Sequence, residues 1–237
     1  MDSEDSAVMP TDRLPEGDEK RTAVQSMFDT IAPRYDLVNR ILTFRMDVGW
    51  RRQTQKALAL KPGSTILDLA CGTGDFCVEL AAGGHQPIGI DLSYGMLANA
   101  RTPAPLVQGD LLQLPLADAC VDAAVCGFAL RNLVELGPFF TELYRVVRPG
   151  GRIALLDVSQ PDNALMRWGH GLYFNNVVPR VGGLLSDRGA YSYLPKSVSY
   201  LPEPAEMIAM LGRAGLADAE RHQLTGGISQ LLTATRP

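Results

Sequence analysis

The sequence predicts an α/β domain built on a mostly parallel sheet of seven strands, with an antiparallel hairpin at its C-terminal end. Three observations predict this fold. From residue 65 onward, short β-rich runs alternate with segments of helical period, which is typical of right-handed crossovers between parallel strands. A glycine-rich turn follows the first run, at residues 70–74. The last two β-rich runs flank Gly226-Gly227, a pair that favours a hairpin turn.

The same patterns place the elements in order. Strands are expected at 65–69, 87–91, 105–109, 121–127 and 152–158, and the hairpin at 217–224 and 228–234. Helices are expected at 75–82, 94–101, 136–147 and 204–213, where apolar residues recur at helical spacing. Arg148-Pro-Gly-Gly151 predicts a turn. These elements form a single domain over 21–237, a size that suits one sheet and one core.

Three segments lie outside this alternation. Residues 21–60 carry apolar positions at helical spacing and predict a helical lead-in. Residues 163–201 are rich in aromatic residues with interspersed Gly and Pro, and predict a helical insertion, which we interpret as a substrate lid. Simple core packing is the alternative for this insertion. Residues 1–20 hold seven acidic residues against Arg13 and Lys20, and we expect a disordered acidic tail.

Composition excludes several classes of protein. The net charge is −4, and removing the tail leaves +1, so no concentrated basic surface indicates a nucleic-acid partner. No apolar run reaches the ~18 residues of a membrane span, and the acidic start lacks the features of a secretory signal. The four cysteines lack metal-ligand spacing, so we expect reduced thiols and no metal site. A cytoplasmic protein is expected, with peripheral contact to the inner face of the membrane and a homodimer left open.

Acidic and glycine residues follow successive strands of the predicted sheet, where open parallel sheets bind ligands. Gly72 and Gly74 let the backbone turn tightly and approach a ligand. Asp68 ends the first strand, Asp91 ends the second, where a carboxylate can accept from two ribose hydroxyls, and Asp110 follows the third, near an adenine amino group. The sequence therefore predicts a nucleoside site, with a purely structural turn as the alternative.

The residues around the turn favour one cofactor over another. A dinucleotide-binding fingerprint needs a third glycine at position 77, where this chain has Cys77. The acidic residues around the turn suit a ligand with a sulfonium cation. We therefore predict S-adenosyl-L-methionine as the cofactor.

Further blocks carry a resemblance over essentially everything after the tail. They are Trp50-Arg51 and residues 28–39, 67–75, 128–132, 144–151, 191–198 and 224–228. On these blocks the chain resembles the ubiquinone/menaquinone biosynthesis C-methyltransferase family. It departs from the family at 43–50, where a glycine and often a histidine are usual, and at Gly189-Ala190, where an acidic residue is usual.

The resemblance implies a class I S-adenosylmethionine-dependent methyltransferase with a Rossmann-like fold, acting on a carbon of a polyprenylated quinol ring. Demethylmenaquinol is the expected acceptor and the ubiquinone precursor its rival. Carried over by position, cofactor contacts also fall on Thr73, Asp91 and the Asp110-Leu111 pair, with Gly127 near the methionine part. The resemblance further implies Arg131 in substrate activation and Tyr35 in the pocket.

The chemistry limits what Arg131 can do. A ring carbon becomes nucleophilic when an adjacent hydroxyl is deprotonated, so the acceptor must be the reduced quinol. A guanidinium stays protonated, and Arg131 is therefore expected to stabilise the phenolate rather than act as base. His170 and His222 are conceivable bases. A structural salt bridge for Arg131, core packing for Tyr35, another apolar acceptor such as a polyketide or sterol-like ring, and a non-catalytic binding protein are the alternatives.

Overall fold

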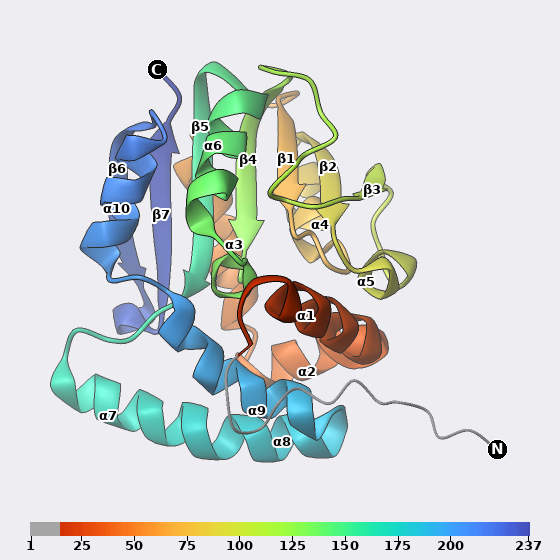
Figure 1. Cartoon of the computed structure of the whole chain (residues 1–237), viewed down its shortest axis with the longest axis vertical. Coiled ribbons are helices and arrows are strands. Elements are labelled where there is room, and N and C mark those ends of the chain that lie inside the picture. The colour runs from red at the N-terminus through yellow and green to blue at the C-terminus, as the bar shows by residue number, and fades with distance from the viewer. Residues whose placement is uncertain (1–14) are drawn as a thin grey trace.

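The computed structural model describes residues 15–237 and contains a seven-stranded sheet of order β3-β2-β1-β4-β5-β7-β6 (Figure 1). β7 runs antiparallel to both of its neighbours, whereas the other pairs are parallel. The strands are β1 (Thr65–Leu69), β2 (Gln86–Asp91), β3 (Leu106–Gln108), β4 (Val121–Gly127), β5 (Val147–Val158), β6 (Ala217–Leu224) and β7 (Ser229–Thr235). The predicted mostly parallel sheet with its C-terminal hairpin is confirmed.

One predicted turn lies inside a strand. β5 begins at Val147, so the segment 148–151 is a bulge in the ladder to β4. Val121 pairs with Val147, whereas Ala123 pairs with Arg152. Gly150 adopts φ 77°, the left-handed conformation for which glycine is favoured. The turn-forming residues therefore produce a bulge, because pairing with β4 resumes on both sides of them.

Helices cover both faces of the sheet. On one face lie α3 (Met46–Ala57) and α4 (Asp75–Ala82), whose Trp50, Phe76 and Leu80 pack on the strands. On the other lie α6 (Leu136–Val146) and α10 (Pro204–Arg213), which bury Phe139 and Leu211. The short α5 (Tyr94–Ala98) follows β2. Single-turn helices occupy 32–34, 130–132, 198–200 and 225–227.

A third layer of helices lies beyond the carboxyl ends of the strands (Figure 1). It contains α1 (Gly17–Ile31), α2 (Tyr35–Leu42), α8 (Val178–Leu185) and α9 (Arg188–Ser197), which share a separate apolar core around Val38 and Tyr191. α7 (Ala164–Leu172) continues through a π-helical turn (Tyr173–Val177) into α8. The lead-in and the insertion are therefore both helical, and they pack on each other.

The lead-in begins earlier than the sequence predicted. α1 starts at Gly17, inside the range expected to be tail, and its Lys20 is only 3% exposed. The Lys20 ammonium donates to the carbonyl of Leu133 at 2.6 Å and lies 3.6 Å from the ring centre of Tyr200. Burial lowers the pKa of Lys20 to about 8. Residues 1–14 of the predicted tail lie outside the described residues.

Within the described part of the chain, no helix has the length and apolar character that crossing a membrane requires.

Candidate active site

Two adjoining cavities lie at the carboxyl edge of the sheet, beside the ends of β1 and β4. The larger has a volume of about 420 Å³ and the smaller about 100 Å³. Residues that line both are Phe28, Tyr35, Ala70, Gly72, Gly127 and Phe128. The two cavities therefore meet at the predicted glycine-rich turn, at the switch point of the sheet.

The backbone at this junction is strained. Ala70 and Phe128, which directly follow β1 and β4, adopt left-handed φ values of 54° and 62°. Such conformations cost non-glycine residues on the order of 1–2 kcal/mol and gather at functional sites. Gly74 adopts φ 85°, and a Cβ there would lie 2.4 Å from Thr102 Cγ2. The turn therefore requires glycine at position 74 for both conformation and space.

The small cavity carries two of the predicted carboxylates. Asp91 Oδ2 accepts from the Gly72 N–H at 2.7 Å, and Asp91 Oδ1 accepts from the Ser93 N–H at 2.8 Å. Burial raises the pKa of Asp91, while these backbone donors oppose the increase. Asp110 forms an ion pair with Arg21 at 3.1 Å and accepts from the Leu112 N–H. Each carboxylate oxygen has a second lone pair with which to accept from a ligand hydroxyl or amine.

The remaining lining of the small cavity fits a nucleoside. Its apolar sides include Val24, Met96 and Leu111. Asn132 also lines it, and the buried Oδ1 of this residue has no hydrogen-bond partner among the described residues. At Gly127 a Cβ would lie 3.3 Å from the ring of Phe76, which would have to shift by a few tenths of an ångström to admit it. Apolar sides for a base and unpaired acceptors for hydroxyl and amino groups are the features that S-adenosylmethionine requires.

The predicted cofactor residues divide between the two cavities. Those that line the small cavity are Gly72, Asp91, Asp110, Leu111 and Gly127. Asp68 and Thr73 line the large one, and Gly74 shapes the turn. Asp68 is 1% exposed and accepts from the Cys77 thiol at 3.2 Å, and burial raises its pKa to about 7. The Thr73 hydroxyl donates to Asp36 Oδ1 at 2.5 Å.

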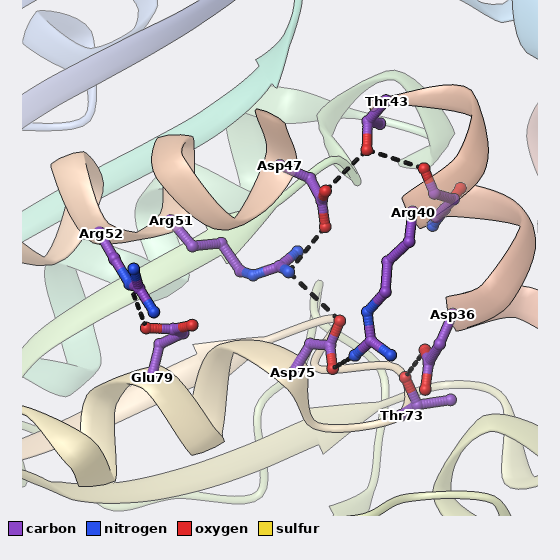
Figure 2. Close-up of polar contacts among 10 residues, drawn as sticks. Asp36, Arg40, Thr43, Asp47, Arg51, Arg52, Thr73, Asp75 and Glu79 are labelled. Atoms are coloured by element: carbon purple, nitrogen blue, oxygen red, sulfur yellow. Dashed lines mark hydrogen bonds and ion pairs between the residues drawn. The ribbon is translucent and has the colours of Figure 1, made fainter. Parts of the chain in front are cut away.

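Ion pairs fasten the lead-in helices to the turn (Figure 2). Arg51 on α3 donates to Asp47 Oδ2 at 2.7 Å and to Asp75 Oδ2 at 3.2 Å, and Arg40 on α2 binds the other Asp75 oxygen at 2.9 Å. Asp47 also accepts from the Thr43 hydroxyl at 2.6 Å. Sequence reasoning missed this network, although the Trp50-Arg51 pair was the signal that could have found it. The network holds one wall of the large cavity against the turn.

Arg131 lines the large cavity and is also part of a buried salt bridge. It is 5% exposed, and its Nη1 donates to Asp157 Oδ1 and to the Phe128 carbonyl, the latter at 2.8 Å. Asp157, which is fully buried on β5, also accepts from the Arg131 backbone N–H at 3.2 Å. Arg131 Nε is buried without a hydrogen-bond partner in the described part of the chain. The guanidinium is therefore held through Nη1, while its Nε has no hydrogen-bond partner among the described residues.

Three ring side chains complete the large cavity. Tyr35 lines both cavities, and burial raises the pKa of its phenol. Tyr191 is 1% exposed, and the structure gives its buried hydroxyl no partner among residues 15–237. His170 stacks on Phe174 with ring centres 5.1 Å apart, and burial lowers the pKa of its imidazole. The other candidate base, His222, lies on the edge strand β6 beside Glu220. Sequence reasoning had not singled out Tyr191.

The sheet order and the acid-lined cavity at its switch point are those expected of an S-adenosylmethionine-dependent methyltransferase. A family model described as the ubiE/COQ5 methyltransferase family matches residues 16–236, and the chain belongs to this family.

Named relatives match nearly the whole chain. A demethylmenaquinone methyltransferase of Deinococcus radiodurans is 43% identical over 230 residues, which cover 92% of this chain and 95% of the relative. A ubiquinone/menaquinone biosynthesis C-methyltransferase of Syntrophotalea carbinolica is 41% identical over 219 residues, covering 89% and 92%.

Solved structures agree on the fold. A S-adenosylmethionine-dependent methyltransferase from Thermotoga maritima superposes with a TM-score of 0.65 at 18% identity, covering 90% of this chain and all of that one. A Haemonchus contortus phosphoethanolamine N-methyltransferase, solved in complex with S-adenosyl-L-methionine, gives 0.57 at 14% identity, covering 78% and 52%.

Proposed function

We propose that the chain transfers a methyl group from S-adenosylmethionine to a ring carbon of a polyprenylated quinol, with demethylmenaquinol as the acceptor. The observation that carries this proposal is the large cavity, which is mostly apolar yet has the buried cation of Arg131 in its lining. Ligand sites of this type bind an apolar body and orient it through a few polar groups. Relatives of about 40% identity that are named for this substrate class support the same acceptor.

The cofactor is assigned to the small cavity. Asp91 would hold the ribose hydroxyls and Asp110 the adenine amino group, with Leu111 against the base. Gly127, at the junction of the cavities, would leave room for the methionine part. When bound, S-adenosylmethionine supplies an electrophilic methyl group on a sulfonium, and the protein has to align the acceptor and exclude water.

Arg131 is assigned to the phenolate. Its charge lies in a buried site where water screens it weakly, so it lowers the cost of removing the hydroxyl proton from the acceptor. Asp157 fixes the guanidinium in one orientation, and Arg131 lines the large cavity, so its charge would lie close to the ring oxygen. Tyr191 also lines this cavity, and its buried hydroxyl, which has no partner among residues 15–237, would bind the second oxygen of a quinol after turning toward the cavity.

The proton acceptor is assigned to His170. The phenols of Tyr35 and Tyr191 have raised pKa values and stay protonated, so they donate hydrogen bonds but do not act as bases. The pKa of His170 is lowered, which leaves a neutral imidazole at pH 7. The hydroxyl proton would move to His170 as the ring carbon takes the methyl group from the sulfonium, whose S–CH3 bond breaks to leave a neutral thioether. The ring carbon would then lose its own proton to restore the aromatic ring, and protonated His170 would return a proton to the ring oxygen. One proton is released to solvent per turnover.

The ubiquinone precursor is kept as a second candidate acceptor, because some relatives are named for both ubiquinone and menaquinone biosynthesis. Two ubiquinone/menaquinone C-methyltransferases are 41% and 37% identical to this chain. The test offers labelled S-adenosylmethionine with demethylmenaquinol, with the ubiquinone precursor, and with a polyketide-like phenol. Transfer to demethylmenaquinol at least ~10-fold faster than to either other ring is expected, since one ring substituent changes pocket fit by ~1–3 kcal/mol. Equal or faster transfer to another ring would reassign the acceptor, and no transfer to any would refute the proposal.

A further inference from the structure

The continuous rod formed by α7, the π-helical turn and α8 has apolar side chains on two faces. Leu165, Trp168 and Leu172 recur at the spacing of one helical face, and they are 75%, 66% and 47% exposed. Met166 and His170, which lie on a different face of α7, line the large cavity. Figure 1 shows the rod along the lower edge of the molecule, on the far side of the helical layer from the sheet. The rod is therefore a wall of the cavity and an apolar surface at once.

The exposed apolar surface extends beyond α7. Leu184 on α8 is 85% exposed. Phe44, in the turn before α3, is 71% exposed and lies 5.8 Å from the ring of Tyr173. Half of the large apolar side chains that are exposed among residues 15–237 lie between 165 and 184. Soluble domains rarely expose so many apolar side chains along one segment without a binding function.

The charges on this surface indicate what it binds. Residues 163–186 contain Arg167 and Arg180 but no Asp or Glu, in a chain whose net charge is −4. Arg180 is exposed, as is Arg45, which follows Phe44. The Arg34 guanidinium lies at the end of α8, where it donates to the Leu185 carbonyl at 3.1 Å. Apolar residues with a tryptophan, bordered by arginines, are typical of helices that lie in an anionic membrane interface.

We propose that the α7–α8 rod lies in the interface of an anionic bilayer, with Leu165, Trp168, Leu172 and Leu184 in the acyl boundary. The large cavity is then separated from lipid by one helix, about 10 Å thick. A polyprenylated acceptor can then reach the cavity without its tail crossing water. The bilayer as the source of the acceptor depends on the proposed function, whereas the surface itself does not.

Vesicle binding tests this surface directly. The full chain is mixed with vesicles of phosphatidylcholine alone or with phosphatidylglycerol, and binding is followed by co-sedimentation and tryptophan emission. Trp168 is exposed, whereas Trp50 is buried and donates to the Thr225 hydroxyl, so a blue shift on binding reports Trp168. We expect binding and a blue shift with the anionic vesicles, weakened by high salt.

Matched variants locate the contact. The triple variant Leu165→Ser, Trp168→Ser and Leu184→Ser should reduce partitioning by at least about 10²-fold, because three apolar side chains no longer enter the acyl boundary. A control that removes exposed apolar residues elsewhere, Val78→Ser, Tyr94→Ser and Val107→Ser, should partition like the wild type. Absent binding, or equal binding by both variants, would overturn the proposal. Self-association in sedimentation that only the first variant abolishes, without vesicle binding, would assign the face to a second copy instead.

The activity assay separates this proposal from the proposed function. With a short-chain acceptor in solution, the triple variant should methylate at the wild-type rate, whereas with a long-chain acceptor in vesicles it should lose about 10-fold or more. Vesicle binding by a protein that methylates no quinol would refute the proposed function and leave the membrane surface standing. Methylation of the quinol without vesicle binding would support the proposed function and refute the membrane surface.

Discussion

The small and large cavities are built in different ways. Most of the small cavity comes from residues 70–134, in the loops and short helices that follow the strands, and α1 covers it. The large cavity combines side chains from the lead-in helices with others from the insertion more than 100 residues later, such as Met27 with Tyr191. The first depends on the sheet, whose strand ends converge by topology. The second depends on helix packing, so local sequence patterns say little about it.

Because of this difference, substitutions in the small cavity should affect binding of the cofactor, and substitutions in the large cavity should affect the acceptor. Asp91 should give the largest effect. Asp91→Ala removes the proposed ribose acceptor and leaves the Gly72 and Ser93 N–H groups without their carboxylate. Charge-assisted hydrogen bonds contribute roughly 1.5–3 kcal/mol each, so a loss of at least ~10³-fold is expected in cofactor affinity. Calorimetric titration with S-adenosylhomocysteine measures it.

Asp122→Ala is the matched control for Asp91. Asp122 also accepts from a backbone N–H, that of Thr65 at 2.8 Å, but at the opposite edge of the sheet. The Asp122→Ala variant should bind the cofactor with the affinity of the wild type. A near-wild-type affinity for Asp91→Ala would remove the small cavity from the cofactor site and break the comparison.

Arg131 lines the large cavity and not the small one, and its loss should affect turnover alone. Removing it singly would leave Asp157 as an unpaired buried charge, which costs about 3–5 kcal/mol of stability. The double variant Arg131→Gln with Asp157→Asn avoids this charge. We expect unchanged cofactor affinity and a decrease in kcat on the order of 10²–10³-fold.

Asp157→Asn alone is the control for that pair. It keeps the cation beside the acceptor and leaves an amide oxygen that can still accept from Arg131 Nη1, at a cost in stability like that of removing Arg131 alone. Measured at a temperature where it is folded, it should lose far less activity than the double variant. Equal losses would mean that Arg131 has only a structural role in the salt bridge.

The sequence predicted the fold well because its elements are local. Strand positions followed from β-rich runs between helices, although β3 spans only 106–108 and α5 ends at Ala98 rather than at 101. The two larger differences were the bulge at 148–151 and the early start of α1. Both exceptions have a tertiary cause, namely pairing with β4 and the packing of Lys20 against Tyr200. The homodimer that the sequence analysis left open stays a prediction.

The site was predictable only in part, for the same reason. The acids at strand ends could be found from position, whereas the ion pairs of Arg51 and the unpaired Tyr191 hydroxyl depend on contacts between remote segments. The departure at 43–50 has a local consequence. Phe44 and Arg45 adopt φ values of 50° and 61°, a conformation that favours glycine, so this chain tolerates strain in that turn.

The pH dependence of activity tests the proposed role of His170 as the proton acceptor in the large cavity. A base must be neutral to accept a proton, so activity should fall as the pH decreases through its pKa, which burial places below the usual 6.5. His170→Gln should reduce kcat about 10²-fold at pH 7.5 and flatten this acidic limb, with cofactor affinity unchanged. His222→Gln, on the edge strand, should keep both the rate and the limb. An acidic limb that persists unchanged in His170→Gln would assign the proton to another group.

Tyr191, in the large cavity, should give the smallest effect. This effect should concern the acceptor and leave the cofactor unaffected. Its hydroxyl is buried and unpaired in the described structure, so Tyr191→Phe should leave the melting temperature unchanged or raise it slightly. If the hydroxyl binds the second quinol oxygen, KM for the acceptor should increase about 5–10-fold, with cofactor affinity unchanged.

Gly182→Ala offers an independent test of the same contact. A Cβ at position 182 would lie 2.2 Å from the Tyr191 ring, so the ring must shift and the hydroxyl must move with it. This variant should therefore reproduce the increase in KM and also lower stability, since overpacking costs roughly 1–3 kcal/mol. A Tyr191→Phe variant with wild-type KM would show that this hydroxyl does not contact the acceptor, and would leave Arg131 as the group that orients the ring.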